Sequence, residues 1–336
     1  QRQMCIRDRA DFEAMKTNLL RNAGIFVFLL AATLCAHVSA EDTLEMFSKR
    51  GQWEQMNISY ANIHIGLEKP FSVLHISDTH LSGVYPHESD RKRNLSRDRT
   101  QTFGGLQADA LAASMDWAGR YCDYVVHTGD LIDFQSEANY DVAKKYLGDN
   151  LIISVGNHEF SPEMWLSEIP EERTELYKSY TRDEINSVYG IDSKFQSKTV
   201  NGVNFVAIDN VYGTVTPNQV KRFNQEIKKG LPIVLCMHVP FFSDEMWRAN
   251  ERYWTRGGAK FRDASVPRPK GDYLAQQTDK TTREFIAALK KEPLLKAILA
   301  GHIHIGYQEE FSPTATQYVA GPNFMFSGLS LIQISE

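Results

Sequence analysis

Five short apolar segments, each followed closely by aspartate, asparagine or histidine, are the feature that most restricts the fold of this chain. They lie at residues 72–76, 124–126, 151–155, 232–237 and 295–300. Uninterrupted runs of aliphatic and β-branched residues are typical of strands buried on both faces. Segments with helical spacing of apolar residues lie between them, at 106–120, 137–147, 217–228 and 281–291. This alternation predicts an α/β fold, with further strands at 204–209 and 316–320.

The polar residues that follow the five segments include metal-ligand types. The fragments are Asp-Thr-His, Gly-Asp, Gly-Asn-His, a single histidine and Gly-His-Ile-His. Because open α/β sheets place ligands beyond the carboxyl ends of their strands, residues far apart in the sequence can meet in one cleft. Gly129, Gly156 and Gly301 fit this arrangement, since a chain that turns sharply beside a bound ion benefits from a residue without Cβ. The residues expected to meet are Asp78, His80, Asp130, Asn157, His238, His302 and His304.

Seven oxygen and nitrogen donors are more than one tetrahedral ion can use, but they suit two ions that share a carboxylate. Two ions about 3.5–4 Å apart can hold a nucleophilic hydroxide and neutralise phosphoryl oxygens during an in-line displacement. The donor set contains imidazoles and no thiolate, which favours manganese, iron or zinc over calcium.

The ordered fragments resemble the calcineurin-like metallophosphoesterase family, and the resemblance extends from about residue 71 to about residue 323. It implies two sheets packed face to face with helices outside, in four αββα layers. It also implies that Asp78, His80 and His304 hold one metal, that Asn157, His238 and His302 hold the other, and that Asp130 bridges them. His158 then resembles the residue that stabilises the transition state or protonates the leaving oxygen. An imidazole suits proton transfer because it titrates near neutral pH.

One position departs from a branch of that family. Purple acid phosphatases carry a tyrosine three residues after the bridging aspartate, whereas this chain has Asp133. A purple iron enzyme is therefore not expected. We expect Asp133 and Glu159 to orient ligand imidazoles, and His75 and His127 to lie in the sheet core or behind the ligands.

Composition agrees with a globular enzyme. The 336 residues are 42% hydrophobic and 24% charged, with a net charge of −5. A dedicated nucleic-acid binder usually has a basic balance, so we expect a phosphorylated small molecule as the substrate and no nucleic acid.

The amino-terminal region predicts export. Lys16 and Arg21 precede an apolar run at 23–36, and Val38-Ser39-Ala40 resembles a signal-peptidase site. The run is too short to span a bilayer well, so cleavage near Ala40 is favoured over a stable membrane anchor. Lipidation at Cys35 is a weaker alternative, because Leu34 stands where a small residue is normally found.

These observations divide the chain into several segments. Residues 1–14 and 329–336 resemble non-native extensions, 15–40 a signal peptide, 41–70 a lead-in, and 71–328 the metallophosphoesterase domain. Within the domain, residues 241–277 lack clear periodicity and mix aromatic residues with arginines, which fits either a lid over the substrate or a surface insertion. The basic run at 91–99 fits either phosphate recognition or a solvated face.

The function expected from these features is hydrolysis of phosphoester bonds, in monoesters or diesters, by an exported two-metal enzyme. The alternative is a non-catalytic exported protein that uses the metal site to bind phosphorylated ligands. A third possibility, a DNA nuclease, is disfavoured by the charge balance and the export signal.

Overall fold

Two β-sheets form the centre of the protein in the computed structural model, which describes residues 56–65, 67, 69–162, 174–255, 270–326 and 329–335. The first sheet has the strand order β1-β11-β2-β3-β4. Its strands are β1 Ile58–His64, β2 Phe71–Ile76, β3 Tyr124–Thr128, β4 Leu151–Ser154 and β11 Leu329–Ser335. Strands β2, β3 and β4 run parallel, and β11 pairs antiparallel with β2 and parallel with β1.

The second sheet has the strand order β5-β6-β7-β8-β10-β9. Its strands are β5 Phe195–Val200, β6 Val203–Ile208, β7 Ile233–Cys236, β8 Leu295–Ala300, β9 Tyr307–Ser312 and β10 Ala315–Val319. The four inner strands run parallel to one another, and the edge strands β5 and β9 are antiparallel to their neighbours. Strands β2, β3, β4, β6, β7, β8 and β10 confirm the strands that the sequence predicts.

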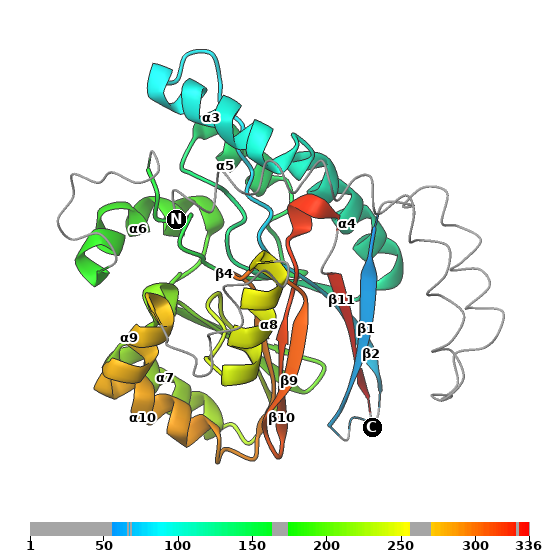
Figure 1. The fold of residues 1–336 in the computed structure, drawn as a ribbon. Helices are drawn as coiled ribbons and strands as arrows, with labels where there is room; N and C mark the ends of the chain where they lie inside the picture. The colour runs from blue at the N-terminus through cyan, green and yellow to red at the C-terminus, as the bar shows by residue number, and fades with distance from the viewer. Residues whose placement is uncertain are drawn as a thin grey trace.

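Most helices of the described chain cover the outer faces of the sheets, whereas α3 extends beyond the strands at the top of the view (Figure 1). They are α3 Asp90–Phe103, α4 Gln107–Tyr121, α5 Glu137–Lys144, α6 Glu175–Tyr189, α7 Pro217–Ile227, α8 Asp244–Thr255, α9 Asp272–Thr278 and α10 Lys280–Leu289. Two 3-10 turns, η2 Val211–Gly213 and η4 Asn323–Met325, complete the set. The helices predicted from periodicity are confirmed as α4, α5, α7 and α10, within a few residues at their ends.

Three apolar clusters show the layers. One contains Val73, Val126, Phe205 and Leu299 and lies between the two sheets. A second joins the outer face of the first sheet to α4, α5 and α6, and a third joins the outer face of the second sheet to α7, α9 and α10. Because burying apolar surface stabilises by about 25 cal/mol per Å², these three interfaces hold the four layers together. The predicted four-layer sandwich is confirmed.

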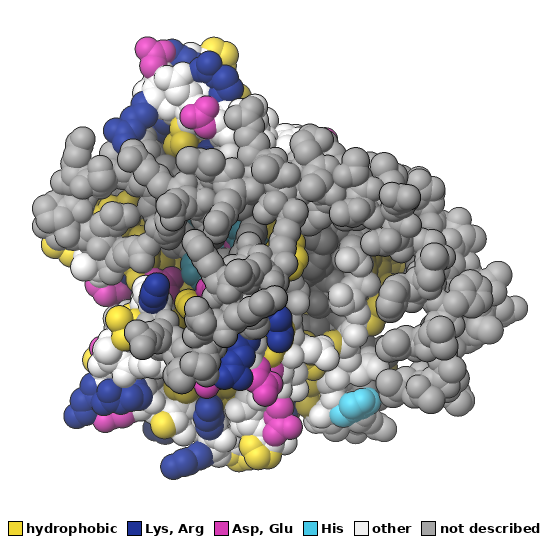
Figure 2. Space-filling model, viewed as in Figure 1, with side chains coloured by type: hydrophobic (Ala, Val, Ile, Leu, Met, Phe, Trp, Pro, Cys, Tyr) yellow, Lys and Arg dark blue, Asp and Glu magenta, His cyan; other side chains and the backbone are white. Residues whose placement is uncertain are grey.

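The interpretation of residues 241–277 as aperiodic is wrong for the parts that the structure describes. Residues 244–255 form α8 and residues 272–278 form α9. Helix α8 is amphipathic, with Met246 buried in the core cluster of the second sheet and Trp247 and Ala249 packed against that cluster. The basic run at 91–99 likewise forms most of α3, and Figure 2 shows its basic side chains gathered with acidic ones at the top of the view.

Two segments that lie outside the predicted domain bounds are strands of the first sheet. Residues 329–335, expected to belong to a non-native extension, form β11, and β1 within the lead-in pairs with it. The origin of the 329–336 segment stays a prediction. The predicted signal peptide at 15–40 and the extension at 1–14 lie outside the described residues. Within the part of the chain that the structure describes, no helix has the length and apolar character needed to cross a membrane.

Candidate metal centre

The predicted ligands all follow the carboxyl ends of strands. Asp78 and His80 follow β2, Asp130 follows β3, and Asn157 follows β4. In the second sheet His238 follows β7, and the Gly-His-Ile-His motif follows β8. The two sheets therefore bring their functional ends to the same region, as the sequence predicts for an open α/β arrangement.

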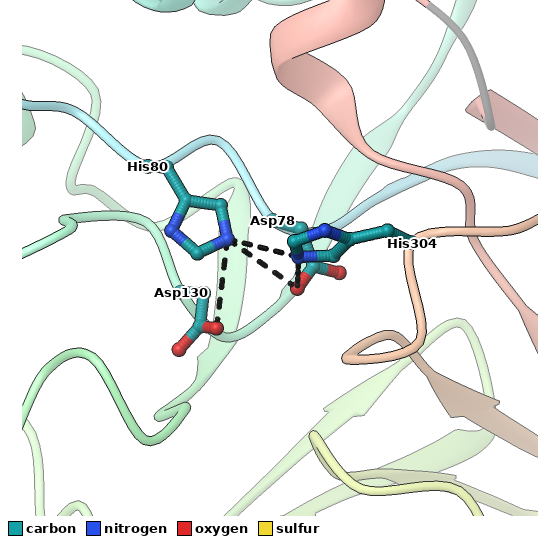
Figure 3. Close-up of side chains that lie close together, drawn as sticks. All are labelled: Asp78, His80, Asp130 and His304. Atoms are coloured by element: carbon teal, nitrogen blue, oxygen red, sulfur yellow. Dashed lines mark hydrogen bonds and ion pairs between the residues drawn. The ribbon is translucent and has the colours of Figure 1, made fainter. Parts of the chain in front are cut away.

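A first cluster consists of Asp78, His80, Asp130 and His304 (Figure 3). His80 Nε2 lies 3.0 Å from His304 Nε2 and 3.7 Å from Asp130 Oδ2. His304 Nε2 lies 3.3 Å from Asp78 Oδ1. Two imidazole nitrogens and two carboxylate oxygens that converge in this way can hold a divalent ion.

A second cluster shares Asp130 with the first and adds His238 and His302. Asp130 Oδ2 lies 3.2 Å from His238 Nε2, and His302 Nδ1 lies 3.2 Å from the same His238 nitrogen. The one oxygen Asp130 Oδ2 thus faces both clusters. This is the arrangement that a bridging carboxylate requires.

Two buried oxygens in the site support the presence of a cation. Asn157 Oδ1 and Asp78 Oδ1 are buried and accept no hydrogen bond. A buried acceptor without a partner costs about 1–3 kcal/mol unless another group satisfies it. A metal ion would satisfy both oxygens. The residues present therefore fit two divalent ions.

The backbone at the site is strained. Eight described residues other than glycine have positive φ, and five of them are predicted ligands: Asp78, His80, Asp130, His302 and His304, with φ between 53° and 72°. Such conformations cost about 1–3 kcal/mol each and occur mainly at functional sites. Hydrogen bonds between the loops hold this backbone, from Asp78 N to Gly129 O at 3.0 Å and from His80 N to Asp130 O at 2.9 Å.

The glycines of the motifs allow the loops to approach closely, as predicted. A Cβ at Gly156 would lie 2.1 Å from Asp130 Oδ1, and one at Gly301 would lie 2.5 Å from Asp78 Oδ2. Neither contact is possible for real atoms, so any side chain at these positions would displace a ligand carboxylate.

The ligand imidazoles are oriented by hydrogen bonds at their second nitrogen. His238 Nδ1 lies 2.8 Å from the Thr128 carbonyl oxygen, which accepts its proton. His80 Nδ1 lies 2.9 Å from Asp133 Oδ1. In both residues Nε2 therefore faces the cluster. A hydrogen bond to one ring nitrogen commonly fixes the tautomer of a metal-binding histidine and leaves the other nitrogen for the metal. The structure supports the predicted orienting role of Asp133.

Asp133 is itself held by an arginine that the sequence analysis did not identify. Arg99 on α3 donates to both Asp133 oxygens, at 2.6 Å from Nε and 2.8 Å from a terminal nitrogen. The Arg99 guanidinium also lies 4.4 Å from the centre of the Phe103 ring, and Phe103 stacks on His80. Burial opposes the charge of Asp133, but Arg99 and the imidazole of His158 outweigh it and hold the pKa of Asp133 well below its usual range.

His158 lies between two carboxylates. Its Nδ1 is 3.1 Å from Asp133 Oδ1 and 2.7 Å from the Asp133 carbonyl oxygen, while its backbone N–H donates to Asp130 Oδ1 at 2.9 Å. Burial lowers the pKa of His158, but the charges of Asp130 and Asp133 more than offset this and raise it to about 9. In the metal-free protein the imidazole of His158 is therefore positively charged at neutral pH.

Glu159 has a different role from the one predicted. Its carboxylate contacts no ligand imidazole in the described structure and instead accepts backbone N–H groups of both metal-binding loops. The donors include Asp130 N at 2.9 Å and Gly156 N at 2.6 Å. Glu159 therefore joins the loop after β3 to the loop after β4.

His75 and His127 lie in the core, as expected. His75 Nε2 contacts Thr128 Oγ1 at 3.0 Å, and His127 Nε2 contacts Thr79 Oγ1 at 2.9 Å. Burial lowers the pKa of both imidazoles to about 3, so both are neutral. Neither belongs to the clusters that can hold a metal ion.

Comparisons with known proteins give one family and several distant structures. The model of the calcineurin-like phosphoesterase family matches residues 71–306. Among curated proteins, no sequence matches the chain. Solved structures that resemble it include a dimetal phosphatase from Danio rerio, a purple acid phosphatase from yellow lupin and a 5'-nucleotidase from Candida albicans.

The structural matches are distant. Sequence identities are 14%, 11% and 14%, with TM-scores of 0.43, 0.42 and 0.37 in the same order. The matches cover 76%, 76% and 80% of this chain, and 88%, 44% and 47% of the other chains. The lupin and Candida proteins are thus about twice as long as the matched region. The family model spans most of the sequence and includes every predicted ligand, and the chain accordingly belongs to the calcineurin-like phosphoesterases.

Proposed function

We propose that this protein is an exported hydrolase that cleaves phosphoester bonds in small phosphorylated molecules with the help of two divalent ions. The observation that carries the proposal is the position of Asp130 Oδ2, which lies 3.7 Å from His80 Nε2 and 3.2 Å from His238 Nε2. One carboxylate oxygen thereby joins two clusters, each with further ligands of its own.

The ligands would be divided as the family resemblance implies. Asp78, His80 and His304 would hold one ion, and Asn157, His238 and His302 the other, with Asp130 shared. When bound, the two ions would activate water as the nucleophile and neutralise charge on the phosphoryl oxygens. The nitrogen-rich donor set without thiolate favours manganese, iron or zinc.

His158 is the residue proposed to assist the reaction directly. Leaving alcohols of alkyl phosphoesters are poor leaving groups, so a proton delivered to the departing oxygen lowers the barrier. In the metal-free protein the charges of Asp130 and Asp133 raise the pKa of His158 to about 9, and Asp133, which is not a predicted ligand, would favour the protonated ring in the loaded enzyme as well. Asp133 holds the ring by its Nδ1, which leaves Nε2 as the nitrogen that can give the proton.

Monoesters and diesters are both compatible with this chemistry, and the family does not separate them. The proposal of export rests on the amino-terminal sequence, and that of a small-molecule substrate on the acidic net charge. The alternative is an exported protein that binds phosphorylated ligands without turnover. The complete set of ligands and His158 supports the enzyme, because a degenerate binding protein would be expected to have lost one of them.

The test compares the wild-type chain with Asp130→Asn and His238→Ala, supplied with manganese, on paired aryl phosphate monoesters and diesters. We expect both variants to lose turnover with little change in fold, because each loses a ligand of the shared or second cluster. His87→Ala is the matched control: this histidine is 65% exposed, pairs with Glu137 and belongs to neither cluster.

The outcomes separate the two proposals. Turnover of either substrate by the wild type, lost in Asp130→Asn and kept in His87→Ala, supports the enzyme, and the ratio of the two rates distinguishes monoesterase from diesterase. Metal uptake by the wild type without turnover of any phosphoester would favour the binding protein. Full activity of Asp130→Asn would overturn the assignment of the site.

A further inference from the structure

We infer that Asp272 is a positioning residue for the second metal site and that the helix carrying it is part of the metal centre. This inference rests on the proposed two-metal function. Asp272 is the first residue of α9, in the 241–277 segment for which the sequence left a choice between a lid and a surface insertion. Its carboxylate contacts His302, a predicted ligand from a separate part of the chain.

The geometry of His302 separates its two nitrogens. Nδ1 lies 3.2 Å from His238 Nε2 and so faces the second cluster, while Nε2 lies 3.2 Å from Asp272 Oδ2. A neutral imidazole has one N–H and one lone pair. If Nε2 carries the proton and donates it to Asp272, the lone pair of Nδ1 is free for a metal ion.

His302 depends on such a partner more than the buried ligands do. The side chain of His302 is 22% exposed, whereas His80 and His238 are almost fully buried. Those two rings are fixed by Asp133 and by the Thr128 carbonyl respectively. Asp272 supplies the corresponding acceptor for His302, and it comes from the 241–277 segment, whereas Asp133 and Thr128 come from strand β3 and the loop that follows it.

The position of Asp272 is fixed by tight packing of its backbone. A Cβ at Gly213 in η2 would lie 2.0 Å from the Asp272 carbonyl oxygen, so the start of α9 rests directly on this glycine. Gly213 has φ of +81°, a conformation that also favours glycine. A side chain at this position would push the Asp272 backbone away.

Further contacts join α9 to the segment that follows His238. Gln276 on α9 donates to the Pro240 carbonyl oxygen at 2.8 Å and accepts from Phe242 N at 2.9 Å. Tyr273 is buried against Phe242 and Trp247, with ring centres 5.7 Å apart in both pairs. The helix that carries Asp272 is therefore attached to the loop of one ligand, His238, while its carboxylate contacts another, His302.

The experiment measures metal affinity as well as activity. Wild type, Asp272→Ala and Asp272→Asn, all as the full chain, are stripped of metal and titrated with Mn²⁺ against a competing chelator, giving one constant for each ion. We expect Asp272→Ala to weaken one of the two by about 10- to 100-fold and to leave the other unchanged. Asp272→Asn should lose less, because its amide oxygen can still accept the proton of Nε2.

Asp279→Ala is the matched control, since Asp279 caps the neighbouring helix α10 by accepting from Thr282 N at 2.7 Å. It tests whether loss of an aspartate at a helix start is itself sufficient to weaken metal binding. Electron paramagnetic resonance gives a second readout. At limiting Mn²⁺ we expect the signal of a coupled pair in the wild type and mainly the signal of isolated Mn²⁺ in Asp272→Ala.

The outcomes distinguish this inference from the proposed function. If the wild type binds two ions and Asp272→Ala binds both with unchanged affinity, the inference is overturned while the proposed function stands. If the wild type binds fewer than two ions, the proposed function fails and the inference fails with it. If Asp272→Ala does not fold, as judged by circular dichroism, the constants of Asp272→Asn decide in the same way.

Discussion

Replacing Glu159 by glutamine should destabilise the protein strongly, although the change alters only one atom of the side chain. Glu159 is fully buried and accepts five hydrogen bonds. Oε2 accepts from Asp130 N and Gly156 N, and Oε1 accepts from Leu131 N, Ile132 N and the Tyr189 hydroxyl. In glutamine one of these oxygens becomes an NH2 group, which cannot accept.

The magnitude follows from the number of donors that lose an acceptor. Whichever way the amide turns, at least two buried backbone N–H groups then face another donor. Each unsatisfied buried group costs about 1–3 kcal/mol, which gives about 2–6 kcal/mol. Glutamine also removes a buried charge, whose cost is seen in the raised pKa of Glu159, so the net loss should lie toward the lower end of that range. This is a large part of the roughly 5–15 kcal/mol that stabilises a typical domain. Activity should fall too, because the Asp130 and Gly156 backbones belong to the metal-binding loops.

The assay is urea unfolding followed by circular dichroism, in excess chelator so that metal binding does not contribute, and at pH 8. That pH lies above the pKa of Glu159, which burial and the charge of Asp130 raise to about 7. Glu284→Gln is the control: Glu284 is 66% exposed, and its replacement should change stability by less than about 0.5 kcal/mol. A loss below about 1 kcal/mol in Glu159→Gln, at unchanged urea dependence, would contradict the role of Glu159 as the acceptor that joins the two loops.

Two predictions concern His158. In His158→Ala we expect metal content to be kept and turnover of alkyl phosphoesters to fall by about 10²- to 10⁴-fold. The loss should be smaller for nitrophenyl esters, because their leaving group needs no proton. Equal losses in steady-state rates for both ester types would contradict a proton-donor role. In metal-free wild type, the raised pKa of His158 means that its stabilising contribution is complete below pH 6.5 and is lost as pH rises through about 9. Urea unfolding across that range should show a loss of about 3 kcal/mol from this group, and the same pH series on His158→Ala should show a smaller one.

The central strands, and the convergence of the predicted ligands at one end of the sheets, could be predicted from sequence because their signals are local. Each run of apolar residues indicates a buried strand by itself, and each predicted ligand follows its strand within a few positions. Gly156 and Gly301 were indicated because each directly precedes a predicted ligand, but the close approach of Asp130 and Asp78 that excludes a side chain there comes from distant parts of the sequence. For the strands, in contrast, the physical cause and the sequence pattern lie in the same short segment.

The residues that support the ligands could not be predicted in the same way. Arg99 belongs to a basic run that is usually a solvated face, and only the packing of α3 against the site directs it to Asp133, 34 positions later. Asp272 lies 30 positions before His302, and no local pattern connects the two. The roles of Asp133 and Glu159 were separated only by the structure, because both are acidic residues close to ligands in sequence.

The two ligand carboxylates show why the strained loops persist. In each, one oxygen holds the backbone and the other faces the metal clusters: Asp78 Oδ2 accepts from His302 N, and Asp130 Oδ1 accepts from His158 N, both at 2.9 Å. The opposite oxygens, Asp78 Oδ1 and Asp130 Oδ2, face ligand imidazoles. Each carboxylate thus fixes a loop from another strand and presents one oxygen to a cluster that could hold a cation. A neutral side chain of the same shape could keep at most the first role, so the arrangement favours charge at a site where burial opposes it.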